Sequence, residues 1–132
     1  MQEKIEQFLA SPAFGVVGAS PKREKYGNKV LRCYLQNDHK AIPVNPVAEK
    51  IEGQDCVASV ADLPAEVNSI SVITPPQVTE KVVEEAIKKG IANVWMQPGA
   101  ESDAAVDRCE EAGINVIADG SCVLVVMGYS EH

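Results

Sequence analysis

The sequence has 132 residues, of which 45% are hydrophobic and 23% charged, proportions typical of a soluble globular protein. This length lets one domain, residues 1–132, bury a core without support from metals or disulfides. A formal net charge of -7 argues against general nucleic-acid binding. No apolar run approaches the roughly 20 residues that cross a bilayer, and the polar start is unlike a secretory signal, so we expect a cytoplasmic protein that makes no membrane contact.

Helices and strands alternate along the chain. Ile5, Phe8 and Leu9 recur at helical spacing and predict a short first helix. The later elements are predicted as strand 13–17, helix 28–36, strand 41–44, strand 69–73, helix 78–87 closed by 88–90, strand 93–96, helix 102–112 and strand 115–118. Gly27 or Asn28 suits the start of the second helix. Residues 47–68 give no clear pattern beyond one helical turn expected at Asp62 and Leu63.

This alternation predicts an α/β fold with a parallel sheet and helices on both faces. Right-handed crossovers close such a sheet as a Rossmann-like, doubly wound fold, here of about five to six strands. Ligands of these sheets bind beyond the carboxyl ends of the strands, near the reversal of strand order. We therefore expect the binding site in the loops at residues 18–27, 45–46, 74–76 and 97–100.

Gly18 stands at the end of the first predicted strand. Because glycine has no β-carbon, backbone N–H groups there can approach a pyrophosphate, and Ser20 adds a hydroxyl donor. A dinucleotide fingerprint would read G-x-G-x-x-G, with an acidic residue after the second strand. This chain has no second glycine in that spacing, and Asn45 and Pro46 stand where the acid would be. The pattern for NAD is weak.

The segment 18–32 is basic within an acidic chain. It has a net charge of +4 from one acid, Glu24, and the cations Lys22, Arg23, Lys25, Lys29 and Arg32. Such a cluster indicates a small anionic ligand with an additional phosphate on its ribose. Coenzyme A fits, because it has a pyrophosphate and a 3′-phosphate. The charge pattern alone leaves open that these cations only solubilise a loop.

Five motifs in order resemble those of a known family: Val16-Val17-Gly18-Ala19-Ser20, Lys25-Tyr26-Gly27-Asn28-Lys29-Val30, Pro43-Val44-Asn45-Pro46, Thr74-Pro75-Pro76 and Trp95-Met96-Gln97-Pro98-Gly99-Ala100. They are similar to the small CoA-binding domain proteins, which in turn resemble the N-terminal domain of the succinyl-CoA synthetase α subunit. The resemblance covers nearly the whole chain. It implies a Rossmann-like domain that holds CoA across its carboxyl-end loops.

The resemblance also implies a role for each matched segment. The phosphates would meet Gly18, Ala19 and Ser20, in a region supported by Lys25, Asn28 and Lys29. The adenosine end would be bordered by Asn45 and Pro46, and the ligand would be flanked further along by Thr74, Pro75 and Pro76. The pantetheine arm would lie near Gln97.

No catalytic residue is predicted, because no nucleophile and base are paired by spacing. No metal site is predicted, because the four cysteines are widely spaced and only two histidines could add imidazole ligands. The phosphorylated histidine of the synthetases belongs to a second domain, and neither His39 nor His132 stands in a comparable context. Cys122 follows the last strand and could form a mixed disulfide with CoA, although a free cysteine is more often a core residue. Cys33 and Cys109 are predicted in the core, and Trp95 is expected to pack against a helix.

The sequence therefore predicts a module that binds CoA or acyl-CoA. Two enzyme alternatives stay open: a fragment of an NAD(P)-binding oxidoreductase, and a detached subunit of an acyl-CoA synthetase that needs a partner chain. A redox-sensing DNA-binding regulator ranks last, because no helix-turn-helix segment fits within this acidic chain. The sequence leaves open whether the domain forms a homodimer or binds a partner protein.

Overall fold

The structure is a computed structural model that describes residues 2–130. In chain order its elements are α1 (Gln2–Leu9), β1 (Ala13–Val17), α2 (Tyr26–Gln36), β2 (Lys40–Val44), β3 (Lys50–Ile51), β4 (Gln54–Asp55), the 3-10 helix η1 (Val60–Asp62), β5 (Val67–Val72), α3 (Pro76–Lys89), β6 (Asn93–Met96), α4 (Asp103–Glu111), β7 (Asn115–Ile117) and α5 (Val123–Met127). No helix among these residues is long and apolar enough to cross a membrane.

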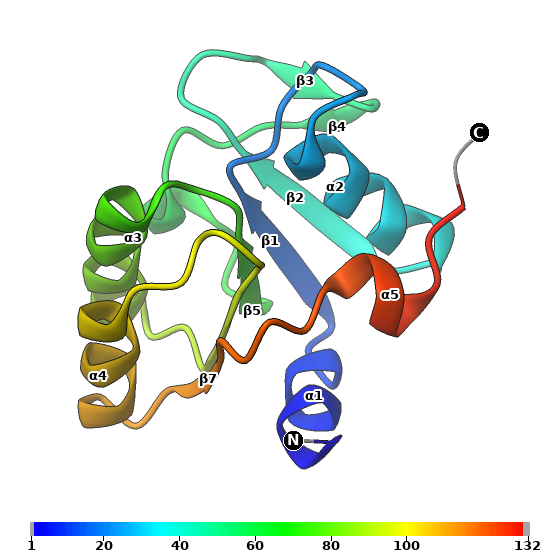
Figure 1. The fold of residues 1–132 in the computed structure, drawn as a ribbon. Helices are drawn as coiled ribbons and strands as arrows, with labels where there is room; N and C mark the ends of the chain where they lie inside the picture. The colour runs from blue at the N-terminus through cyan, green and yellow to red at the C-terminus, as the bar shows by residue number, and fades with distance from the viewer. Residues whose placement is uncertain (1, 131–132) are drawn as a thin grey trace.

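The main sheet has five parallel strands in the order β2-β1-β5-β6-β7. The chain first adds β2 on one side of β1 and then returns to add β5, β6 and β7 on the other side (Figure 1). The order therefore reverses between β1 and β5. The predicted Rossmann-like, doubly wound sheet with helices on both faces is confirmed.

The strands are buried on both faces, as expected of parallel strands between helices. All residues of β1 and β6 are buried. Alternate side chains of β1 enter different cores: Ala13 and Val17 pack with α3 and α4, whereas Phe14 and Val16 pack with α1, α2 and α5. Trp95 is fully buried, stands edge-on to Phe8 and donates its indole N–H to the Ser121 carbonyl, so its predicted packing role is confirmed.

The sequence-based prediction was wrong at the start of the second helix and incomplete in two segments. Helix α2 begins at Tyr26 with Lys25 as its N-cap, so Asn28 lies inside the helix and its side chain serves another purpose. The segment 47–68 contains a β3–β4 hairpin and η1, after which Leu63 is the C-cap. Helix α5 was not predicted, because a short apolar run has no polar residues to show a period.

Candidate binding site at the carboxyl ends of the strands

The loops after β1 and β5 meet where the strand order reverses. Gly18 has φ +98, and a β-carbon there would lie 1.9 Å from the Ile73 carbonyl oxygen. The Ile73 N–H donates to the Val17 carbonyl at 2.8 Å, which holds the two segments together. Only glycine fits both this conformation and this contact.

Gly27, in the first turn of α2, packs against the same loop. A β-carbon there would lie 2.1 Å from the Gly18 carbonyl oxygen. The close approach brings the positive end of α2 to the loop, as a phosphate site requires. Sequence reasoning treated Gly27 only as a helix start, although a second glycine closing the loop onto the helix was the available clue.

Two asparagines hold the backbone of the loop. Asn28 is fully buried, and its Nδ2 donates to the Ser20 carbonyl at 2.8 Å. Asn45, after β2, donates from Nδ2 to the Ala19 carbonyl at 3.0 Å, while its Oδ1 accepts from the N–H groups of residues 47 and 48. Both side chains therefore act on the shape of the loop at Gly18, Ala19 and Ser20.

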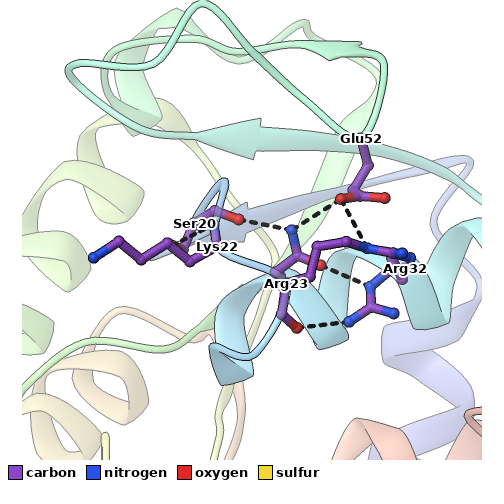
Figure 2. Close-up of polar contacts among 6 residues, drawn as sticks. Ser20, Lys22, Arg23, Arg32 and Glu52 are labelled. Carbon is purple, nitrogen blue, oxygen red and sulfur yellow. Dashed lines mark hydrogen bonds and ion pairs between the residues drawn. The ribbon is translucent and has the colours of Figure 1, made fainter. Parts of the chain in front are cut away.

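The polar side chains of the loop point in different directions. Ser20 Oγ accepts the Lys22 N–H at 3.1 Å, which leaves its own proton for another acceptor. The Lys22 side chain is exposed and extends away from Arg23, whose Nε lies 3.5 Å from Glu52 Oε2 (Figure 2). Lys25 is exposed and Lys29 half-buried. The loop thus offers a hydroxyl and several accessible cations.

A groove of about 310 Å³ runs along these loops. Five of the predicted site residues line it: Gly18, Ala19, Asn45, Pro46 and Thr74. Its apolar walls include Val60 and Val78. A second hollow of about 240 Å³ adjoins it at Thr74 and is lined by Pro75 and the 98–100 segment. Pro76 begins α3, and neither hollow includes it or Gln97.

Gln97 lies beneath this edge, fully buried after β6. Its Oε1 accepts from the Tyr26 hydroxyl at 3.1 Å and from the Val123 N–H at 2.9 Å. Its Nε2 has no hydrogen-bond partner among residues 2–130. The Tyr26 hydroxyl also contacts Cys122 Sγ, and burial raises the pKa of Tyr26, so the phenol remains a donor. Tyr26 thus joins the segments that follow β1, β6 and β7.

Cys33, Cys109 and His39 lie where their side chains pack against other residues. Cys33 and Cys109 are fully buried, as predicted, and burial raises the pKa of each to about 11. His39 stands edge-on to the Phe14 ring at 5.1 Å between centroids, which is a packing role. His132 lies outside the described residues.

Comparisons with known proteins agree with this geometry. The sequence model of a family described as a CoA binding domain matches residues 13–127. A conserved hypothetical protein from Pyrococcus furiosus has 38% identity and a TM-score of 0.82, over 86% of this chain and 97% of that one. The uncharacterized protein YneT of Bacillus subtilis is 25% identical over 88% of this chain and 87% of its own length.

A third relative is much longer. The acetate–CoA ligase (ADP-forming) I of Archaeoglobus fulgidus is 25% identical over 103 residues, which are 78% of this chain. This chain spans 15% of the length of that ligase.

Proposed function

Because this chain belongs to the CoA binding domain family, we propose that it binds coenzyme A, free or acylated, along the groove at the carboxyl ends of β1, β2 and β5. The observation that carries this proposal is the loop at Gly18, which is closed by Gly27 and lies at the reversal of strand order. Parallel α/β sheets hold nucleotides at this point.

In this proposal the pyrophosphate lies on the backbone of Gly18, Ala19 and Ser20, in front of the N-terminal end of α2. The loop cations Lys22, Arg23 and Lys25, together with Lys29 near the start of α2, supply charge for the phosphates. The adenosine lies in the groove between Pro46 and Val78, whose side chains offer apolar surface to a base.

The rest of the ligand continues past the shared wall of the two hollows. Thr74, Pro75 and Pro76 flank it, and the pantetheine arm runs toward the segment of Gln97, which lies buried beneath the two hollows.

We infer a binding module in the cytoplasm, without catalytic residues of its own. The likeness to one domain of an acetate–CoA ligase favours one second candidate, a detached part of an acyl-CoA synthetase. That candidate requires a partner chain with the remaining domains. Copurification of such a chain with the native protein would support it, and its repeated absence would count against it.

Calorimetric titration with CoA and with 3′-dephospho-CoA tests the proposal. We expect CoA to bind at least tenfold more tightly, because the additional phosphate meets the cations of the loop. The combined substitutions Lys22→Gln, Lys25→Gln and Lys29→Gln should remove most of this difference. The control Lys88→Gln, at the far end of α3, should keep it. Equal millimolar binding of both ligands by the unmodified protein would overturn the proposal.

A further inference from the structure

Glu52 is a carboxylate that the fold places beside the basic segment 18–32. It reaches Arg23 from the turn between β3 and β4 (Figure 2). The same carboxylate also accepts a hydrogen bond from Asn28. We infer that Glu52 is a positioning residue, which holds residues 18–29, the loop and the first turn of α2, in the conformation that binds phosphate. The inference rests on the proposed function and adds to it a residue outside the loop and the groove.

The contacts of Glu52 lead directly to the candidate phosphate site. Its Oε2 accepts from Asn28 Nδ2 at 3.1 Å and lies 3.5 Å from Arg23 Nε. The same Asn28 nitrogen donates to the Ser20 carbonyl at 2.8 Å. Only one side chain therefore separates the carboxylate from the backbone of the loop, and Glu52 is 23% exposed whereas Arg23 is 55% exposed.

Arg32 completes the network from inside α2. Its Nε donates to Asn28 Oδ1 at 2.7 Å, and its Nη2 donates to the Arg23 carbonyl at 2.7 Å. Arg23 is thus held at its backbone by Arg32 and at its side chain by Glu52. The Asn28 amide is fixed at both its oxygen and its nitrogen, so its orientation toward Ser20 is set.

The turn that carries Glu52 gives this residue an unfavourable backbone conformation. Ile51 pairs with Gln54, and Glu52 and Gly53 have φ values of 50 and 78, the pattern of a type I′ turn. Such turns prefer Asn, Asp or Gly at the first position. Glutamate is uncommon in this conformation. Its side chain is long enough to contact Arg23 and Asn28, which accounts for a glutamate at this position.

The hairpin is also fixed in place. Ile51 is buried in the core that contains α2, and Val57 pairs with Val44 at the end of β2. The Asn45 N–H donates to the Val57 carbonyl at 2.9 Å. Glu52 is therefore presented from a rigid support, as a residue that positions others must be.

Simple electrostatics and positioning predict opposite results for Glu52→Gln. A carboxylate beside the site repels a polyanionic ligand, so its neutralisation alone would strengthen CoA binding. Positioning predicts that binding weakens, because glutamine removes the ion pair with Arg23 and keeps only one acceptor oxygen, which loosens the hold on Arg23 and Asn28. We expect at least fivefold weaker CoA binding, which is within the range of coupling between contacting residues.

The experiment measures CoA affinity by calorimetry for the wild type, Glu52→Gln, Arg23→Gln, the double variant and Asp55→Asn. Asp55 is the matched control, since it is a carboxylate of the same hairpin, 85% exposed and paired with Lys50. We expect Asp55→Asn to bind as the wild type does. Glu52→Gln removes a negative charge and Arg23→Gln removes a positive charge. If the two residues act together, the CoA affinity of the double variant should be no lower than that of whichever single variant binds CoA more weakly.

Thermal unfolding of each variant separates this role from general stability. If Glu52 is a positioning residue, the effects of the Glu52 and Arg23 substitutions on CoA affinity should not add up. The variants should nevertheless unfold at similar temperatures. Hydrogen exchange of the unliganded protein should show faster exchange of the Lys22 N–H in Glu52→Gln than in the wild type or in Asp55→Asn. Wild-type affinity or tighter binding in Glu52→Gln, or unchanged exchange, would overturn the inference. Failure of the wild type to prefer CoA would overturn the proposed function instead.

Discussion

Gly27 lies against the carbonyl of Gly18 so closely that a β-carbon on Gly27 would be 2.1 Å from the carbonyl oxygen. One glycine ends the first strand, and the other lies in the first turn of the following helix. Their contact fixes the distance between the loop and the N–H groups at the start of α2. The geometry of the proposed phosphate site therefore depends on the absence of a side chain at Gly27.

Gly27→Ala should separate the loop from α2. The added methyl group meets backbone, which cannot move aside without shifting a strand or a helix, so we expect a loss of about 1–3 kcal/mol in the free energy of unfolding. CoA affinity should fall at least tenfold. Chemical denaturation and calorimetry measure the two effects.

Gly113→Ala is the control for Gly27→Ala. Gly113 has φ +77, and a β-carbon added there would have no atom within 4 Å, so the cost of about 1–2 kcal/mol comes from its conformation alone. CoA affinity should stay unchanged. An unaltered affinity in Gly27→Ala would contradict a role for the close contact in binding.

Asn45→Asp should weaken binding more than stability. The carboxylate keeps the acceptor for the N–H groups of residues 47 and 48 but loses the donor to the Ala19 carbonyl, and it adds a negative charge beside the phosphates. We expect about tenfold weaker CoA binding. Asn115→Asp removes amide donors at the opposite end of the sheet, so it should lower stability and leave CoA affinity as it was.

Gln97→Met tests the pantetheine end of the proposed site. Loss of the amide leaves the Tyr26 hydroxyl and the Val123 N–H without their acceptor, which should cost about 1–3 kcal/mol of stability. Binding of CoA should weaken, whereas binding of ADP, which has no pantetheine arm, should not. An equal loss for both ligands in a calorimetric comparison would argue against a role of Gln97 at the pantetheine end.

Stability should fall in alkali because of two buried thiols. Burial raises the pKa of Cys33 and of Cys109 from 9.0 to about 11, so the unfolded chain loses these protons first. The contribution of the two thiols to the free energy of unfolding is fully present below pH 9. Between pH 9 and 11 this contribution declines by roughly 1 kcal/mol per pH unit for each thiol. Urea unfolding across this range should show a shallower decline in the double variant Cys33→Ala, Cys109→Ala; an identical slope would refute this cause.

The sheet and the position of the site could be predicted because they depend on local patterns. Apolar runs that end in polar or glycine-rich loops mark buried parallel strands, and Gly18 follows the first of them. The doubly wound topology then places the loops of Gly18, Asn45 and Thr74 together. The partners of the loop could not be predicted, since Glu52 comes from a hairpin with no sequence pattern and meets Asn28 only through tertiary contact.

Other residues needed the structure for similar reasons. The basic segment appeared as one group of cations, but Arg32 is buried in a network and Arg23 is paired with a carboxylate, whereas Lys22 is exposed. Charge counts along a sequence cannot distinguish these surroundings. Gln97 was expected near the ligand, and its bonds to Tyr26 and Val123 join residues that are far apart in the chain.

The β3–β4 hairpin belongs to the crossover connection between β2 and β5 and contributes no strand to the main sheet. A change in the turn of this hairpin therefore leaves the strand order and register of the main sheet as they are. Through Glu52 the same change would reach the segment at Gly18, Ala19 and Ser20, so this one turn can alter the proposed ligand site independently of the scaffold.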